Sequence, residues 1–180
     1  MPKDKKADEK GAQEPIYEEM RTGVSDREVA EILDKLRKKG EKLALAESLT
    51  AGMITARFAD IPGSSDVLDR AYITYSNTAK HQMVKVRKST LEEHGAVSRQ
   101  TAKQMAEGGA RKAGAAACIS ATGYAGPASD KKDGSVGHVF LGCCYKGKTT
   151  VEEHWYAGKR NEIRVQAMND AIRLLASALK

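Results

Sequence analysis

The chain has 180 residues, of which 41% are hydrophobic, and it has no run approaching the ~18 consecutive apolar residues of a membrane-spanning helix. This length is typical of one domain, and the N-terminus lacks the apolar centre of a signal peptide, so we expect a cytoplasmic protein without a membrane partner. The formal net charge of +6 permits nucleic-acid binding, but the charges are scattered and only 5% of the residues are aromatic, so no nucleic-acid partner is expected.

The N-terminal part divides into a charged segment and a helix. Residues 1–22 mix acidic and basic side chains with almost no apolar periodicity, which predicts a disordered extension before a domain at 23–180. Ser25 begins a capping box that Glu28 completes, and apolar residues then follow at helical spacing. Gly40 is typical of a helix end, so a helix is predicted between Ser25 and Gly40.

Strands and helices alternate over the middle of the chain and give way to a hairpin. We predict strands at 43–47, 67–75 and 115–121, and helices at 50–59, 77–84, about 90–94 and 98–112. Further on, 136–145 and 149–156 flank Lys146-Gly147-Lys148 as a hairpin, before a final helix over about 160–179. This order predicts an α/β fold with three layers, α/β/α, around a mixed sheet with a late antiparallel hairpin.

The cysteines and histidines do not indicate a metal site. Cys118, Cys143 and Cys144 form no Cys-x-x-Cys pair, and the four histidines have no metal-ligand spacing. Adjacent Cys143 and Cys144 would point to opposite faces of a strand. We therefore expect buried thiols in a reducing compartment, with no metal and no cofactor.

Ser48 stands where the first predicted strand gives way to a helix. A hydroxyl there is exposed at the edge of the sheet, and the backbone N–H groups that follow it, those of Leu49 and Thr50, can stabilise an oxyanion. Ser48 alone is also a common helix N-cap.

A serine nucleophile needs a base, and Lys80 is the candidate, since no histidine is an obvious partner. Taken alone, Lys80 is a solvated helix lysine with a pKa far too high for a base. Burial, or positive charge nearby, must lower that pKa by roughly three units, about 4 kcal/mol. Tyr75 can share the proton because a phenol both donates and accepts. Four cationic side chains lie near Lys80 in sequence: His81, Lys85, Arg87 and Lys88.

Six short motifs occur in order and together are typical of one family. They are Ala-Glu-Ser-Leu-Thr-Ala-Gly at 46–52, Pro-Gly-Ser-Ser at 62–65, Tyr-Ser-Asn-Thr-Ala-Lys at 75–80, Gly-Ala-Val-Ser at 95–98, Thr-Gly-Tyr-Ala-Gly-Pro at 122–127 and Gly-Lys-Arg-Asn-Glu-Ile-Arg at 158–164. From about residue 25 to its end, the chain resembles the CinA C-terminal domain family, which includes the nicotinamide mononucleotide deamidases.

The resemblance implies an amidohydrolase that converts nicotinamide mononucleotide to nicotinate mononucleotide and ammonia, with Ser48 as nucleophile assisted by Lys80 and Tyr75. Gly123 and Gly126 either present N–H groups to a phosphate or merely make a tight turn. Arg160 and Arg164 either bind the phosphate or pair with Glu162 or Asp170. The expected substrate-binding residues are Glu47, Asn77, Thr122, Gly123, Gly126, Arg160 and Arg164.

Several positions depart from the family pattern. Leu49 replaces a cysteine, Ala51 a glycine and Lys159 an acid, and a glycine pair is missing after Pro127. The alternative function is therefore a catalytically weak or inactive homologue that still binds a nucleotide. We expect the small-molecule partner to be a pyridine nucleotide and the assembly to be a homodimer.

Overall fold

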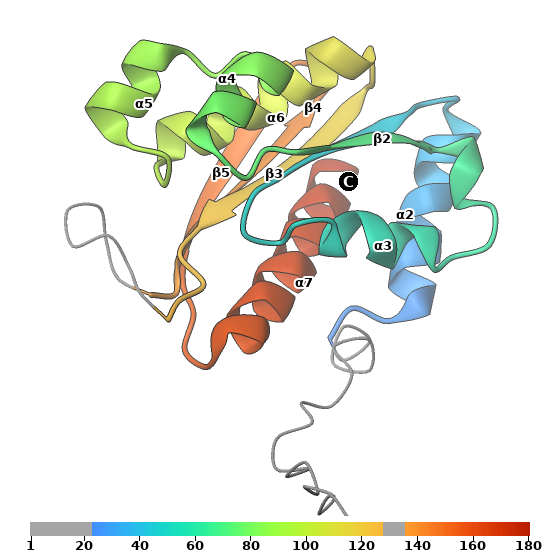
Figure 1. The fold of residues 1–180 in the computed structure, drawn as a ribbon. Helices are drawn as coiled ribbons and strands as arrows, with labels where there is room; N and C mark the ends of the chain where they lie inside the picture. Colours follow the sequence, from blue (N-terminus) through green and yellow to red (C-terminus); the bar gives the residue numbers. More distant parts are fainter. Residues whose placement is uncertain (1–22, 128–135) are drawn as a thin grey trace, which may run out of the picture.

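The computed structural model describes residues 23–127 and 136–180 (Figure 1). The predicted N-terminal extension, residues 1–22, lies outside these ranges, and so does the segment that departs from the family pattern after Pro127. Within the described ranges, no helix has the length and apolar character needed to cross a membrane.

The predicted elements are present, and their order is confirmed. The helices are α2 Asp26–Lys38, α3 Met53–Ala59, α4 Asn77–Val84, α5 Lys88–His94, α6 Arg99–Ala113 and α7 Arg160–Ala178. The strands are β1 Leu43–Glu47, β2 Leu68–Ile73, β3 Ala117–Gly123, β4 His138–Tyr145 and β5 Lys148–Trp155, with a short 3₁₀ helix at Ser64–Asp66. Two boundaries matter for the site: α3 begins three residues later than predicted, and β3 ends two residues later.

The strands form one mixed sheet in the order β2-β1-β3-β4-β5. β1 pairs in parallel with β2 and β3, whereas β3–β4 and β4–β5 are antiparallel, so the late hairpin is confirmed. Figure 1 shows α2, α3 and α7 on one face of the sheet and α4, α5 and α6 on the other. The fold is therefore the predicted three-layer α/β/α arrangement.

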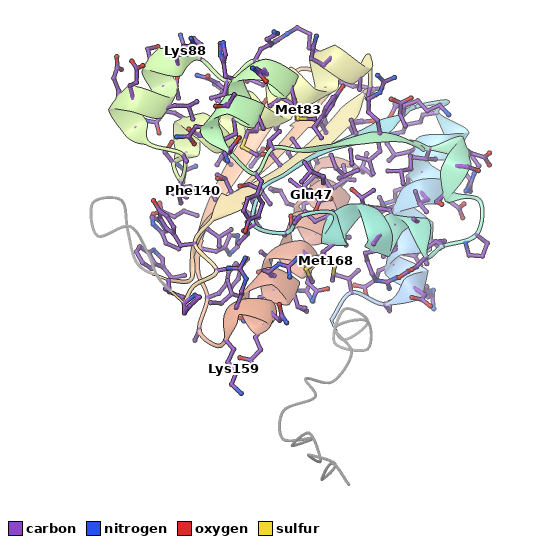
Figure 2. All side chains as sticks on the ribbon, viewed as in Figure 1. Glu47, Met83, Lys88, Phe140, Lys159 and Met168 are labelled. Atoms are coloured by element: carbon purple, nitrogen blue, oxygen red, sulfur yellow. The ribbon has the colours of Figure 1, made fainter. Side chains whose placement is uncertain are left out.

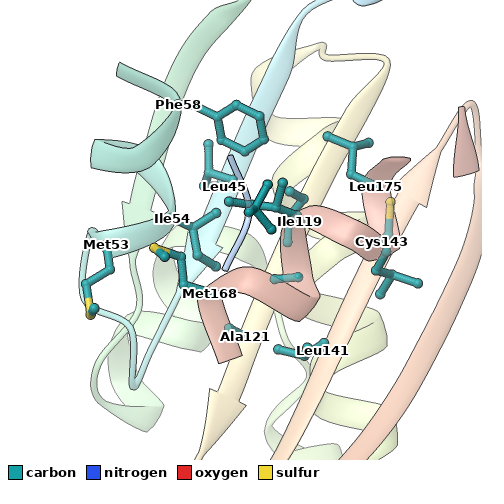
Figure 3. Packing of buried hydrophobic residues seen from close by; sticks show 14 of the residues in the cluster. Leu45, Met53, Ile54, Phe58, Ile119, Ala121, Leu141, Cys143, Met168 and Leu175 are labelled. Atoms are coloured by element: carbon teal, nitrogen blue, oxygen red, sulfur yellow. The ribbon is translucent and has the colours of Figure 1, made fainter. Parts of the chain in front are cut away.

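The two faces of the sheet are packed with side chains of different size. In β1, Leu43 and Leu45 belong to the large core cluster under α3 and α7, while Ala44 and Ala46 belong to the smaller cluster under α6. Figure 3 shows the large side, where aliphatic side chains of the strands meet those of both helices. On the small side α6 lies close to the sheet: a Cβ added to Gly109 would lie 2.5 Å from Cys118 Sγ.

The predicted helix caps are also confirmed. Ser25 Oγ accepts from Glu28 N while Glu28 Oε2 accepts from Ser25 N at 2.8 Å, which completes the capping box of α2. Ser98 Oγ accepts from Thr101 N at 3.1 Å and begins α6. These bonds satisfy N–H groups that the first helical turn leaves free.

The three cysteines are free thiols and all are buried. Cys143 packs in the large cluster and Cys144 in the small one, which confirms that these neighbours point to opposite faces. Burial raises the pKa of Cys143 to about 12, so this thiol is protonated and unreactive at neutral pH.

Candidate active site

The turn that carries Ser48 connects the end of β1 to α3. Ser48 N donates to Ala121 O at 2.9 Å, and Ala51 N donates to Ser48 O at 3.1 Å. The N-cap of α3 is Gly52, with a φ of 99°, so the alternative that Ser48 caps this helix is wrong. The Ser48 hydroxyl is consequently available for another partner.

That partner is Lys80, in the first half of α4. Lys80 Nζ donates to Ser48 Oγ at 3.0 Å and to Thr74 O at 2.9 Å, and the residue is only 2% exposed. Within the described part of the chain, no carboxylate pairs with this amine.

Burial lowers the pKa of Lys80 from its ordinary value of 10.5 to about 8. The sequence left open two causes for a lowered Lys80 pKa, burial and nearby positive charge. Burial is the cause in this structure, and the neighbouring basic side chains do not contribute. About a tenth of the amine is then neutral at pH 7, compared with well under a thousandth for a solvated lysine.

Ser48 and Lys80 lie in a cavity of about 230 Å³ at the carboxyl ends of the parallel strands. The structure brings together most of the residues predicted for the site, from segments far apart in sequence. The predicted residues that line the cavity are Ser48, Leu49, Tyr75, Asn77, Lys80, Thr122, Gly123, Gly126 and Arg160. Among the described residues, no histidine and no carboxylate lines it.

Four lining residues were not predicted: Ala96, Val97, Tyr124 and Ala125. The signal was present, because all four lie inside motifs at 95–98 and 122–127. Thr122 explains how the two motifs meet, since its hydroxyl donates to Ala96 O at 2.7 Å.

Arg160 lies at the first turn of α7 and spans one side of the cavity. Its guanidinium donates to Tyr75 Oη at 2.9 Å and also to Gly126 O. Tyr75 is 58% exposed, and no hydrogen bond joins it to Ser48 or Lys80 in the described structure. Arg160 therefore links the loop after β2 to the loop after β3 and leaves a positive charge beside the cavity.

Arg164, one turn further along α7, is not part of the cavity lining. Its Nε donates to Leu49 O at 2.9 Å, and a terminal nitrogen donates to Thr50 O at 3.1 Å. Both acceptors follow Ser48 directly, so Arg164 holds the turn that carries Ser48. The pairing with Asp170 that the sequence also allowed is not observed.

Glu47 likewise lies outside the cavity lining and is fully buried between the sheet and α3 (Figure 2). One oxygen accepts from Gly52 N at 2.8 Å, and the other accepts from Thr55 N at 2.9 Å. The carboxylate thus satisfies the N–H groups at the start of α3, where negative charge also interacts favourably with the helix dipole.

The backbone N–H groups of Leu49 and Thr50 have no hydrogen-bond acceptor among the described residues. Arg164 fixes the carbonyl groups of the same two residues. Backbone N–H groups that are free and held in place beside a serine hydroxyl can bind an oxyanion that forms there.

Gly123 and Gly126, at the end of β3 and just after it, are both closely packed. Gly123 is the last residue of β3, not part of a loop as predicted, and an added Cβ would lie 2.6 Å from Val139 Cγ2. Gly126 has a φ of 81°, which favours glycine, and its carbonyl accepts from Arg160. Gly126 thus makes a turn, one of the two alternatives, while the contact of these glycines with a phosphate stays a prediction.

Residues 26–179 match the sequence model of the CinA C-terminal domain. The chain belongs to this family. A "Putative competence-damage inducible protein" of Caldanaerobacter subterraneus subsp. tengcongensis is 38% identical, over 95% of this chain and 45% of the relative. A "CinA-like protein" of Syntrophobacter fumaroxidans is 42% identical, over 79% of this chain and 34% of the relative. The chain thus spans less than half the length of these curated relatives.

Solved structures of CinA proteins share the fold. The competence/damage inducible protein CihA from Agrobacterium tumefaciens is 35% identical with a TM-score of 0.82, and the match covers 86% of this chain and 95% of that one. A competence damage-inducible protein from Klebsiella pneumoniae is 29% identical, also with a TM-score of 0.82, over 86% of this chain and 96% of that one.

The departures from the CinA pattern can now be placed. The Leu49 side chain is buried in the large core cluster, so an apolar side chain replaces the family's cysteine in the core. Ala51 has a φ of 48°, a left-handed conformation that explains the family's glycine and strains an alanine. Lys159 is the N-cap of α7 and projects away from the sheet (Figure 2).

Proposed function

We propose that this chain is an amidohydrolase that deamidates nicotinamide mononucleotide, giving nicotinate mononucleotide and ammonia. The observation that carries the proposal is the contact between Lys80 Nζ and Ser48 Oγ, 3.0 Å long, made by a buried lysine whose pKa is lowered to about 8. A solvated lysine is almost fully protonated at neutral pH, whereas part of the Lys80 population is neutral there and can accept a proton.

In the first step, neutral Lys80 takes the proton of the Ser48 hydroxyl while the oxygen attacks the carboxamide carbon. The negative charge that develops on the amide oxygen is stabilised by the free N–H groups of Leu49 and Thr50. A fixed donor of this kind contributes about 3 kcal/mol to transition-state stabilisation. The protonated amine then passes its proton to the leaving nitrogen, and ammonia departs from the acyl-enzyme.

In the second step, water hydrolyses the acyl-enzyme. Lys80 is neutral again after ammonia has left, so it can take a proton from the water that attacks the Ser48 ester. Collapse of this intermediate releases the carboxylate product and returns the proton to Ser48. The same two side chains therefore serve both halves of the reaction.

The positive charge of Arg160 supports a substrate that carries a phosphate. Besides Lys80, it is the only cationic side chain among the described residues that line the cavity. A phosphate held by Arg160 would orient the carboxamide beside Ser48, so that binding energy from a non-reacting group assists the chemical step.

The decisive experiment measures ammonia release from nicotinamide mononucleotide by the parent chain and by Ser48→Ala. We expect turnover by the parent and a loss of at least about a thousandfold in the variant, with ligand affinity nearly unchanged. Turnover retained by Ser48→Ala would mean another nucleophile or direct attack by water.

Strain at Ala51 favours one other candidate, a weak homologue that binds the nucleotide without hydrolysing it. Ala51 follows the two peptides proposed to hold the oxyanion, so its strained conformation bears directly on them. Saturable binding of nicotinamide mononucleotide without ammonia release by the parent would favour this candidate.

A second experiment separates the roles of the two arginines. Arg160→Ala should lower the preference for nicotinamide mononucleotide over nicotinamide riboside, measured as the ratio of kcat/KM values. Arg164→Ala should instead slow both substrates alike, because it holds the Ser48 turn and does not reach the cavity. Equal kcat/KM values for both substrates in the parent would contradict the phosphate assignment.

A further inference from the structure

A second hollow lies between α6 and the loop that joins α4 to α5. These elements belong to the helical layer of α4, α5 and α6, which also carries Lys80 (Figure 1). The volume of the hollow is about 380 Å³, compared with about 230 Å³ for the candidate active site, and the two cavities share no lining residue in the part of the chain that the structure describes. Four cationic side chains line it, Lys85, Arg87, Lys103 and Arg111, against one carboxylate, that of Glu107.

The local fold presents these charges in fixed positions. Val84 and Val86 are fully buried, so Lys85 between them is directed outward, in a left-handed conformation with a φ of 61°. Arg87 N donates to Gln104 Oε1 at 2.9 Å, and the amide of Gln104 donates to Thr90 Oγ1 at 2.9 Å. These bonds join the α4–α5 loop to α6 and set the width of the hollow.

The charges are not neutralised within the described chain. Lys85, Arg87 and Arg111 form no ion pair with other described residues, and the contact of Lys103 with Glu107 is 3.9 Å long. All four cationic side chains are exposed and screened by solvent, but an anion that enters the hollow can contact several of them at once. The hollow is therefore complementary to a ligand with several negative charges.

The spread of the charges favours a chain of phosphates over a single one. Lys103 and Arg111 lie on the same face of α6, and their separation along the helix axis is about 12 Å. One phosphate cannot contact both ends of such a row, whereas a nucleoside polyphosphate, with its phosphates at one end and its base at the other, can.

A neighbouring hollow of about 440 Å³ shares Glu107 and Arg111 with the basic one. The rest of its lining is apolar or small: Ala110, Gly114, Ala115, Cys144 and Gly147. A planar base fits such a lining, and the guanidinium of Arg111 lies at the junction, where it can stack on a ring.

We propose that this face is a second binding site, which takes a nucleoside di- or triphosphate. The polyphosphate contacts Lys85, Arg87 and Lys103, and the base occupies the apolar hollow beyond Arg111. A nucleic-acid strand is the less favoured ligand, because among the described residues no aromatic side chain lines either hollow for the stacking of successive bases.

The test is calorimetric titration of the full chain with ATP, with inorganic tripolyphosphate and with adenosine. We expect saturable binding of ATP, weaker binding of tripolyphosphate and the weakest binding of adenosine. Arg87→Gln combined with Lys103→Gln should weaken ATP binding by at least about tenfold, since two charge-assisted contacts are lost. The matched control, Lys35→Gln with Lys38→Gln, removes the same charge from α2 on the opposite layer and should leave binding unchanged.

Four results would overturn the proposal. The first is the absence of saturable ATP binding up to about 1 mM, and the second is an equal loss of ATP affinity in the control pair. The third is a loss of ATP affinity in Arg160→Ala but not in the Arg87 and Lys103 double variant. The fourth is tighter binding of a single-stranded oligonucleotide than of ATP. The third would locate ATP in the catalytic cavity. Since the assay measures binding alone, its outcome is independent of whether the chain deamidates nicotinamide mononucleotide.

Discussion

At the scale of single residues, the important property is the protonation of Lys80. Its pKa is lowered to about 8 by burial, and it contacts Ser48 Oγ directly. If it is the base, kcat/KM should rise with pH through an apparent pKa near 8 and level off above it, because only the neutral amine accepts the serine proton. A pH profile of ammonia release between pH 6 and about 9.5 checks this.

Lys80→Arg tests the same role at constant charge. A guanidinium stays protonated in proteins, so this variant should lose about a hundredfold or more in kcat, as Lys80→Ala should. Lys35→Arg, on the exposed side of α2, is the control. A rate for Lys80→Arg close to that of the parent would leave Lys80 an electrostatic role only.

Ala51 shows how one methyl group strains the backbone of the turn that carries Ser48. At a φ of 48° an alanine is strained, and glycine is not. Ala51→Gly should therefore raise the free energy of unfolding by about 1 kcal/mol, measured by urea denaturation. The control Ala59→Gly, at a helical position, should lower it by a similar amount. Equal losses in both variants would show that the turn is not strained.

At the scale of elements, the site depends on how closely α4 packs on α6. A Cβ added to Gly108 would lie 1.7 Å from Val84 O, so even one methyl group would force these helices apart. Gly108→Ala should lower the free energy of unfolding by about 1–3 kcal/mol and should also reduce kcat, because α4 carries Lys80. Lys112→Ala, on the exposed side of α6, should change neither quantity. A stable and fully active Gly108→Ala variant would show that α4 can shift without moving its lysine.

α7 has a comparable role on the other side of the sheet. Its first turns provide Arg160, which links two loops at the cavity, and Arg164, which holds the carbonyl groups behind Ser48. α7 therefore contributes to a candidate site whose serine, Ser48, follows the first strand of the sheet.

At the scale of the whole molecule, burying Lys80 has a cost in stability that depends on pH. Because its pKa is lower in the folded state, unfolding takes up a proton between about pH 8 and 10.5, and this penalty on folding is present in full below pH 8. Lys80→Met removes the penalty, which is on the order of 3 kcal/mol. The variant should thus be more stable than the parent at pH 7, and the difference should shrink as pH rises from 8 to 10.5. A pH-independent difference in the free energy of unfolding would contradict the shift.

The sequence by itself determined the order of elements, and it indicated Ser48 and Lys80 as the candidate catalytic pair. Apolar periodicity, the capping box at Ser25 and the turn at Lys146-Gly147 are local signals, and local signals specify local structure. Ser48 and Lys80 were recognisable because the motifs that contain them occur in order along the chain. The leucine and alanine alternation in β1 already separates a large-residue face of the sheet from a small-residue face.

Only the tertiary structure decided which contacts the side chains around Ser48 and Lys80 make. Glu47 and Arg164 lie in the same motifs as residues that line the cavity. Glu47 nevertheless binds the start of α3, and Arg164 binds the carbonyl groups that follow Ser48. Which of two causes lowers the pKa of Lys80 was equally undecidable from sequence, because desolvation depends on how three layers close around an amine. The direction in which a side chain points and the extent of its burial depend on packing between segments that can lie more than a hundred residues apart, such as those of Arg164 and Leu49. The spacing of residues in the sequence does not encode this packing.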